Sequence, residues 1–466
     1  MKNRVYIGDL HKHIDEEITV AGWVNIRRDH GKLIFVDLRD MSGLVQIVFL
    51  PSHTEAREVA NEIRPEWVVE VQAKVNKRPE KMINIDEQNG DIELEVLNIK
   101  VLNQSKTPPF EVNEDTINID EEVRLKYRYL DLRTKRMQNN IRIRDKVITF
   151  FREYMHKNNF VEIETPLLMK GTPEGSREYL VPSRIEQGKF YALPQSPQQY
   201  KQLCMVAGFE KYFQIARCMR DEDLRGDRQP EFTQLDYEMS FITQEEVLQF
   251  TEKMFIEFVE KLFPEKKISK TPFTRITYVE SMEKYGSDKP DLRENKEDKN
   301  ELAFVWVVDF PMFEKDEEGE LTTAHHPFCS VKEEDKKKFM DGENLLSIRA
   351  NSYDLVLNGF ELSSGSIRIH EQELQEKMFD LLGISKQEQQ SRFGHILEAF
   401  KYGAPPHGGF APGIDRILML LLGEPNIREV IAFPKTGEAK EIMTGSPTPA
   451  NKKQLKELGI KIQTKK

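Results

Sequence analysis

Five short runs of β-forming residues within the first 104 positions constrain the fold of this chain most strongly. Each run is β-branched or alternates between apolar and polar residues, and turn sequences such as 40–43 (DMSG) and 88–90 (QNG) separate several of them. With one helical stretch near 53–64, this spacing predicts a small Greek-key barrel of the OB type. The predicted strands are 18–24, 32–40, 44–49, 67–75 and 91–102.

Two of these strands carry polar or aromatic residues where a simple barrel wall would not need them. In 32–40, Ile34 and Val36 share one face, whereas Phe35 lies on the opposite face among charged side chains. On the next strand, Gln46 points away from its apolar neighbours. OB barrels bind single-stranded nucleic acid by stacking bases on exposed aromatics beside hydrogen-bonding side chains. The alternative is that Phe35 packs under a loop.

The charge of the chain is unevenly distributed. A net charge of −11 argues against a non-specific nucleic-acid binder, which should be basic overall. Between Arg124 and Lys146, however, nine Lys and Arg residues stand against two acids. This basic belt is consistent either with a surface that guides an anionic polymer or with an ordinary solvated face.

Composition also predicts the environment. The longest run of large apolar residues, 417–422, is far shorter than the roughly 18 residues needed to span a membrane. The first residues lack an apolar signal region. The three cysteines show no CxxC spacing, so we expect neither disulfides nor a zinc site. We therefore predict a reduced, cytoplasmic chain with no membrane partner.

A second domain is expected after the segment 106–112 (KTPPFEV), which reads as a linker. Residues 139–158 have apolar positions at helical spacing, and a helix near 413–423 follows a glycine-rich turn. Strands dominate between them, which predicts an α+β domain with an antiparallel sheet flanked by helices. The predicted strands are 160–165, 189–194, 211–218, 231–241, 302–311 and 354–369.

Three segments carry the candidate chemistry. Residues 217–238 form a highly charged connection between two apolar strands, and its arginines are suited to phosphoryl oxygens. Asp354 and Glu361 are carboxylates on predicted strands, the kind of ligand that Mg²⁺ prefers beside substrate oxygens. The turn 407–413 (HGGFAPG) leads into Arg416. Taken singly, the glycine-rich turn and the carboxylate pair are weak signals.

The helix and strand that end at Pro166 resemble motif 1 of the class II aminoacyl-tRNA synthetases. The strand–loop–strand with Arg220 and Glu222 resembles motif 2, and the glycine-rich strand and helix with Arg416 resemble motif 3. The barrel resembles that of the aspartyl, asparaginyl and lysyl subclass. Longer strings resemble the bacterial-type aspartyl members over nearly the whole chain. These strings are 128–133 (RYLDLR), 172–175 (TPEG), 194–198 (PQSPQ) with Lys201, 220–225 (RDEDLR), 228–234 (RQPEFTQ) and 325–328 (HHPF).

The resemblance implies specific roles. Arg220 would bind the ATP α-phosphate and the reacting carboxylate, and Arg416 would bind the γ-phosphate and stack on adenine opposite Phe232. Lys201 and Arg368 would clamp the aspartate side chain. The remaining implied aspartate-site residues are Glu174, Ser196, Gln198, Asp236, His325 and His326. Glu222 and Gln234 would complete the catalytic and ATP-binding set, Asp354 and Glu361 would bind Mg²⁺, and Arg28, Phe35, Gln46 and Glu93 would bind the anticodon.

The resemblance also divides the chain into an anticodon-binding domain (1–104), a hinge (105–135) and a catalytic domain (136–466). Two departures from the bacterial pattern stand out. The usual insertion domain is absent near 293–302, and Ser363-Ser364-Gly365 replaces three glycines. The motif 1 helix and strand imply a homodimer.

The alternatives are the same chemistry with asparagine or lysine, and an RNA-binding paralogue without catalysis. Because asparagine would leave two cations poorly paired, Lys201 and Arg368 favour aspartate. A paralogue usually loses motif residues, and none is lost here.

The partner is expected to be tRNA(Asp). A second substrate, tRNA(Asn), is weakly favoured because His30 resembles relaxed enzymes, although Lys81 resembles strict ones.

Overall fold

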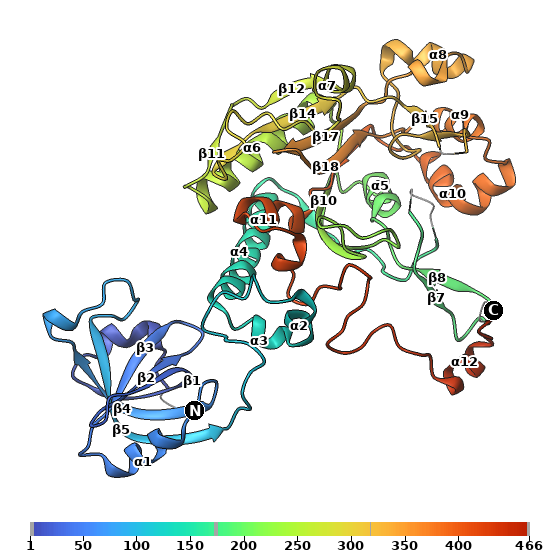
Figure 1. Ribbon diagram of the computed structural model, residues 1–466. Coiled ribbons are helices and arrows are strands. Elements are labelled where there is room, and N and C mark those ends of the chain that lie inside the picture. Colours follow the sequence, from blue (N-terminus) through green and yellow to red (C-terminus); the bar gives the residue numbers. More distant parts are fainter. Residues whose placement is uncertain (1–3, 172–175, 317, 464–466) are drawn as a thin grey trace. The chain divides into compact units, whose positions relative to one another are not determined.

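The computed structural model describes residues 4–171, 176–316 and 318–463 and divides into two units, Met1–Gln138 and Asn139–Lys466. Figure 1 traces the chain from the barrel, in blue, to the C-terminal helices. The predicted site residue Glu174 lies outside the described residues.

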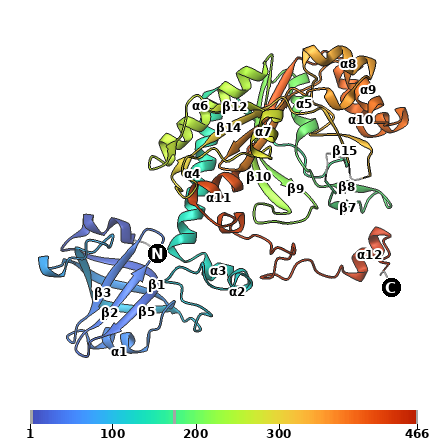
Figure 2. The same ribbon diagram turned by 45° about the horizontal axis from the view of Figure 1, so that its top comes forward.

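The first unit contains a closed five-stranded barrel in the order β1-β2-β3-β5-β4. Figure 2 draws this unit in blue from a second side. All neighbours pair antiparallel except β3 and β5, which are parallel. This confirms the predicted barrel, and only strand ends shift. Its elements are η1 (Ile7–His13), β1 (Glu17–Asp29), β2 (Ile34–Arg39), β3 (Leu44–Phe49), α1 (Thr54–Glu62), β4 (Val68–Lys77), η2 (Glu80–Met82), β5 (Ile92–Asn103), α2 (Glu121–Lys126) and α3 (Arg128–Asp131).

The alternation read from the sequence sets the barrel wall. Ile34, Val36 and Leu38 are buried in the barrel core, whereas Phe35 is half-buried on the outer face. The barrel therefore leaves the polar face of β2 available for binding.

The second unit is built on an eight-stranded sheet in the order β12-β14-β17-β18-β19-β10-β9-β6. Its six central strands are antiparallel, as predicted, but β12 and β6 pair in parallel at the two edges, so the sheet is mixed. Its strands are β6 (Val161–Glu162), β9 (Lys211–Met219), β10 (Glu231–Ser240), β12 (Thr274–Thr277), β14 (Phe304–Val308), β17 (Ser352–Leu357), β18 (Phe360–Ile367) and β19 (His407–Phe410).

Three short two-stranded sheets and several helices complete the unit, and α9 and α10 lie side by side in both views (Figures 1 and 2). The short strands are β7 (Leu180–Pro182), β8 (Phe190–Ala192), β11 (Lys267–Ile268), β13 (Glu301–Leu302), β15 (Phe313–Lys315) and β16 (Leu321–Thr323). The helices are α4 (Lys135–Lys157), which begins in the first unit, α5 (Gln198–Val206), α6 (Gln244–Leu262), α7 (Tyr278–Tyr285), η3 (Glu333–Asp335), α8 (Lys336–Asp341), η4 (Leu345–Ser347), α9 (Gln372–Leu381), α10 (Lys386–Phe400), α11 (Ile414–Leu422), η5 (Ile427–Val430) and α12 (Lys452–Leu458).

Several predicted boundaries were wrong. The stretch 354–369 was read as one strand but is a hairpin of β17 and β18, because Asn358 and Gly359 both adopt positive φ at the turn. The stretch 160–165 forms only the two-residue strand β6, and 302–311 is interrupted at Ala303. Helix α6 was missed, although Thr243 and Glu246 form a capping box at its start.

One face of the large sheet carries the main core and the other carries the polar pocket. On β10, Leu235, Tyr237 and Met239 pack in the core together with residues of α4, α6 and α11. Because strand side chains alternate, Asp236 and Glu238 point to the opposite face. The same strand therefore supplies both core and pocket.

The basic belt is not one solvated face. Arg124 and Arg128 are buried and pair with Asp131, and Arg133 pairs with Glu66. These three arginines therefore have internal partners, and the interpretation of the belt as an RNA guide stays a prediction.

Candidate active site

A polar cavity of about 280 Å³ opens on the pocket face of the second unit. Its wall combines α5, the charged segment after β9, the strand β10, the histidine pair, β18 and the start of α11. The predicted residues that line it are Ser196, Gln198, Lys201, Arg220, Glu222, Phe232, Gln234, Asp236, His325, His326, Glu361, Arg368 and Arg416. Residues far apart in the sequence thus meet in one site.

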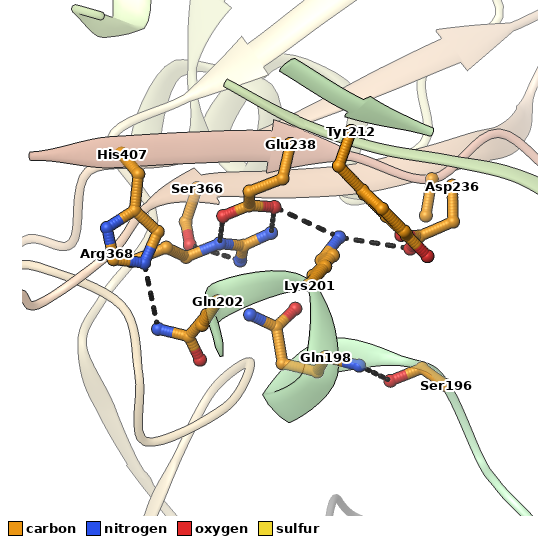
Figure 3. Close-up of polar contacts among 12 residues, drawn as sticks. Ser196, Gln198, Lys201, Gln202, Tyr212, Asp236, Glu238, Ser366, Arg368 and His407 are labelled. Carbon is orange, nitrogen blue, oxygen red and sulfur yellow. Dashed lines mark hydrogen bonds and ion pairs between the residues drawn. The ribbon is translucent and has the colours of Figure 1, made fainter. Parts of the chain in front are cut away.

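Four buried charges lie together at this pocket (Figure 3), and three of them, Lys201, Asp236 and Arg368, line it. Lys201 Nζ lies 3.0 Å from Asp236 Oδ2 and 3.1 Å from Glu238 Oε2. Arg368 donates from Nε and Nη2 to the two oxygens of Glu238, at 2.9 and 3.2 Å. Each of the four residues is at most 2% exposed. Two cations and two carboxylates therefore compensate one another away from water.

Glu238 was missed in the sequence, yet it contacts both predicted clamp residues. Burial raises its pKa, but the charges of Arg368 and Lys201 outweigh burial and lower the pKa to about 2. The available signal was strand periodicity, since Glu238 lies two residues after Asp236 on the same face of β10.

Among the described residues, two of the buried polar atoms near these charges have no hydrogen-bond partner. They are Asp236 Oδ1 and Gln198 Nε2. Burial raises the pKa of Asp236, and the charge of Lys201 opposes that rise. Because unpaired buried polar groups destabilise a protein, these atoms indicate a site shaped to receive a polar ligand.

The two histidines make different contacts. His326 accepts a hydrogen bond at Nε2 from Arg368 Nη1 at 2.6 Å, and burial together with the Arg368 charge lowers its pKa well below the usual range. His325 Nε2 lies 3.2 Å from Asp354 Oδ1. His326 therefore faces the clamp, whereas His325 faces the carboxylate pair.

Asp354 on β17 and Glu361 on β18 come from paired strands of the hairpin. Glu361 Oε2 lies 2.9 Å from Lys289 Nζ and Oε1 accepts a hydrogen bond from Ser364, one of the serines that replace glycine. Across the part of the chain that is described, no group of three or more His, Cys, Asp or Glu residues could bind a metal.

The outer part of the pocket is rich in arginine. The Arg220 guanidinium lies 5.1 Å from the centre of the Phe232 ring. Arg416 Nη2 donates to Asp227 at 3.1 Å and Nη1 donates to the Glu361 carbonyl. Arg228 pairs with Glu222 at 3.4 Å. The amide of Gln234 donates to the Ala411 carbonyl at 3.0 Å.

A second polar cluster lies on the barrel and includes three of the four predicted anticodon residues, Arg28, Gln46 and Glu93, while Phe35 lies opposite Arg28 on the neighbouring strand. Arg28 forms two hydrogen bonds to Asp37, at 2.8 and 2.7 Å, and also reaches Gln46 at 3.3 Å. Gln46 in turn donates to Glu93 at 3.3 Å. Asp37 was missed, although it lies directly opposite Gln46 on the neighbouring strand.

The two predicted tRNA-specificity residues differ in their surroundings. The His30 ring packs edge-on against Phe35, with centroids 5.5 Å apart, so it belongs to the barrel cluster. Lys81 is exposed on η2. His30 therefore contacts a residue of the predicted anticodon set.

Comparisons with known proteins agree with both halves of the chain. The family described as tRNA synthetases class II (D, K and N) matches residues 120–437, and the OB-fold nucleic acid binding domain matches residues 18–102. The chain therefore belongs to the class II tRNA synthetases of the aspartate, lysine and asparagine group, in the family of the bacterial aspartate–tRNA ligases.

The curated relatives cover almost the full chain. The aspartate–tRNA(Asp/Asn) ligase of Rubrobacter xylanophilus is 43% identical, over 98% of this chain and 96% of that protein. The aspartate–tRNA ligase of Staphylococcus aureus is 41% identical, over 97% of both. The first alignment spans 580 positions, more than the 466 residues here, so the relative has residues that this chain lacks.

Solved structures show the same fold at lower identity. An asparaginyl-tRNA synthetase from Pyrococcus horikoshii matches with a TM-score of 0.75 and 20% identity, covering 94% of this chain and 99% of the other. An aspartyl tRNA synthetase from Entamoeba histolytica matches with a TM-score of 0.72 and 24% identity, covering 92% and 91%. The predicted α+β class and synthetase fold are thereby confirmed.

Proposed function

We propose that this chain ligates L-aspartate to tRNA(Asp) at the expense of ATP, through an aspartyl-adenylate. The observation that carries the proposal is the pair of buried cations, Lys201 and Arg368, beside two polar atoms that have no partner among the described residues. A carboxylate side chain would be attracted to the cations. The free Asp236 Oδ1 would accept a hydrogen bond from the ammonium group, with Ser196, Gln198 and Glu174 around it.

The amino acid is selected by charge. Asparagine brings no charge to the clamp, and a lysine side chain would be repelled by Lys201 and Arg368. The curated relatives named as aspartate ligases support the same choice.

Activation requires a carboxylate oxygen to attack the α-phosphorus of ATP while pyrophosphate leaves. The residues for this step position the reactants and neutralise charge, because no proton has to be transferred. Arg220 would bind the α-phosphate and the attacking carboxylate, and Phe232 and Arg416 would bracket the adenine. Arg416 would also reach the γ-phosphate, while Glu222 and Gln234 line the nucleotide side and His325 and His326 close over the amino acid.

Asp354 and Glu361 fit a magnesium ion in their donor chemistry. Two carboxylate residues are a suitable set for Mg²⁺, which takes its remaining ligands from water and phosphate oxygens. The 2.9 Å contact with Lys289 shows that Glu361 already pairs with a cation. A bound Mg²⁺ would neutralise phosphate charge.

The barrel would read the anticodon. Phe35 would stack on a base, while Arg28, Gln46 and Glu93 offer both donors and acceptors to base edges.

We further propose that the chain divides into an anticodon-binding domain (1–104), a hinge (105–135) and a catalytic domain (136–466), with no insertion domain near 293–302. We also propose that the protein is a cytoplasmic homodimer.

Pyrophosphate exchange tests the amino-acid assignment. With ATP and Mg²⁺, aspartate should support exchange, whereas asparagine and lysine should not. Exchange that follows asparagine or lysine instead would overturn the proposal. Binding of tRNA without any exchange would favour a non-catalytic RNA-binding protein.

We also propose that tRNA(Asn) is a second substrate. The support is His30 against Phe35 and the Rubrobacter relative named for both tRNAs. Charging purified tRNA(Asn) with labelled aspartate tests this, with tRNA(Asp) as the positive control. No product above background would restrict the enzyme to tRNA(Asp).

A further inference from the structure

A cluster centred on Arg144 links α4, β10 and the start of α11, and Arg217 Nη1 on β9 also donates to Thr233 Oγ1 at 3.3 Å. Arg144 donates from Nη1 to Asp415 Oδ1 and from Nη2 to Thr233 Oγ1, the latter at 3.1 Å. Asp415 Oδ2 accepts the Thr233 backbone N–H at 2.9 Å. Arg144 also donates to the Val430 carbonyl at 3.1 Å. Arg144, Thr233 and Asp415 are called the Arg144 cluster below.

The neighbours of this cluster make it relevant to the nucleotide. Thr233 lies between Phe232 and Gln234 on β10, and Asp415 directly precedes Arg416 on α11. Thr233 and Asp415 are 4% and 3% exposed, and Asp415 contributes to the pocket wall. The cluster therefore joins β10 to α11, the two segments that carry Phe232 and Arg416, which are proposed to contact the adenine and the phosphates.

Charge gives Arg144 a second effect. Asp415 is a buried carboxylate in the wall of a pocket that would receive a polyphosphate. Without Arg144 it would repel that polyphosphate and attract the neighbouring Arg416. A buried charge that loses its partner is strongly unfavourable, so removing Arg144 should destabilise the part of the pocket wall that contains Asp415.

We propose that Arg144 is a positioning residue for ATP, acting through Asp415 and Thr233 on Arg416 and Phe232. This inference rests on the proposed function for the identity of the nucleotide. Within the described part of the chain, the hydrogen bonds of Lys201 and Arg368 do not involve the Arg144 cluster, so aspartate binding should respond little to Arg144.

The test measures ATP and aspartate binding separately in Arg144→Met and Arg144→Lys. Calorimetry without aspartate gives the Kd for ATP, and pyrophosphate exchange gives both KM values. Loss of charge-assisted hydrogen bonds should weaken ATP binding about tenfold in Arg144→Met, with the KM for aspartate changed less than about twofold. Arg144→Lys, which keeps the charge but not the fork, should fall between Arg144→Met and wild type.

Two further variants separate positioning from general stability. Arg152→Met removes an arginine of the same helix that pairs with Glu162 at 3.0 Å on the surface, and both KM values should stay unchanged. Adding Asp415→Asn to Arg144→Met removes the unpaired carboxylate and should recover part of the ATP affinity.

Equal changes in both KM values, or a lower Tm with unchanged ATP affinity, would overturn the inference. If the double variant binds ATP no more tightly than Arg144→Met, the proposed repulsion between Asp415 and the polyphosphate is wrong. If Arg144→Met does not fold, unchanged ATP affinity in Arg144→Lys would overturn the inference that Arg144 positions ATP. If wild type binds ATP but shows no aspartate-dependent exchange, the proposed function fails, while the order of ATP affinities still tests Arg144.

Discussion

The amino-acid pocket and the outer face of the barrel both depend on charged side chains, but at different depths. Lys201 and Arg368 are each 2% exposed and lie between buried carboxylates. The Arg28 side chain on the barrel is 41% exposed and pairs with Asp37. Burial makes each pocket charge indispensable to the others, whereas water screens the charges of the barrel. Substitutions should therefore have large effects in the pocket and moderate ones on the barrel.

The largest expected effect is on Arg220. If Arg220 binds the α-phosphate as proposed, Arg220→Ala removes a cation from the point where charge develops in the transition state, so pyrophosphate exchange should fall about 1,000-fold or more. The Tm should change little, because Arg220 is only half-buried and lies against the Phe232 ring. Near-normal exchange would mean that the assignment of Arg220 is wrong.

Glu238 should show how strongly the pocket charges depend on one another. Glu238→Gln leaves Lys201 and Arg368 short of a carboxylate, and exchange should fall about 100-fold as the clamp loses its geometry. Asp37→Asn on the barrel is the matched change at a partly exposed pair, and it should leave exchange at the wild-type rate. Similar losses of pyrophosphate exchange in both variants would contradict the difference in burial between the pocket and the barrel.

The same carboxylate predicts a pH dependence. The pKa of Glu238 is lowered from 4.5 to about 2 in the folded protein, so its contribution to stability is present above pH 4.5 and disappears as the pH falls towards 2. The stability gap between wild type and Glu238→Gln should therefore shrink by about 3 kcal/mol over that range. Urea unfolding at several pH values measures it, and a constant gap would exclude this linkage.

On the barrel, Phe35→Ala should separate RNA binding from activation. The loss of one stacked base should weaken tRNA charging by about tenfold, while pyrophosphate exchange stays at the wild-type level. Ile34→Val is a control on the same strand, because it changes the core face and not the binding face. An equal loss of exchange in Phe35→Ala would count against a separate RNA-reading barrel.

The smallest expected effect comes from salt. Raising KCl from about 50 to 200 mM shortens the screening length and should weaken tRNA charging. Exchange should change less than about threefold, since the pocket charges are shielded from the solvent. A steeper salt dependence of exchange than of charging would reverse the comparison.

Much of this protein could be predicted from its residues. The barrel strands followed from alternation and turns, because a two-residue period and local turn chemistry are local properties. The long motifs identified the synthetase resemblance, and the family comparisons confirmed it. The Asn358-Gly359 turn was also readable but was overlooked.

Tertiary structure decided which charges meet. The sequence placed Lys201, Asp236 and Arg368 in one pocket only through resemblance, and it did not single out Glu238, which joins two of them. The run of arginines from 124 to 146 looked like one basic surface, yet the fold distributes it among internal partners that include Asp131 and Asp415. Periodicity shows which way a side chain points along its own strand or helix. The partner across the sheet, and the burial that sets the strength of an ion pair, depend on chain segments hundreds of residues apart, and only the packed fold brings them together.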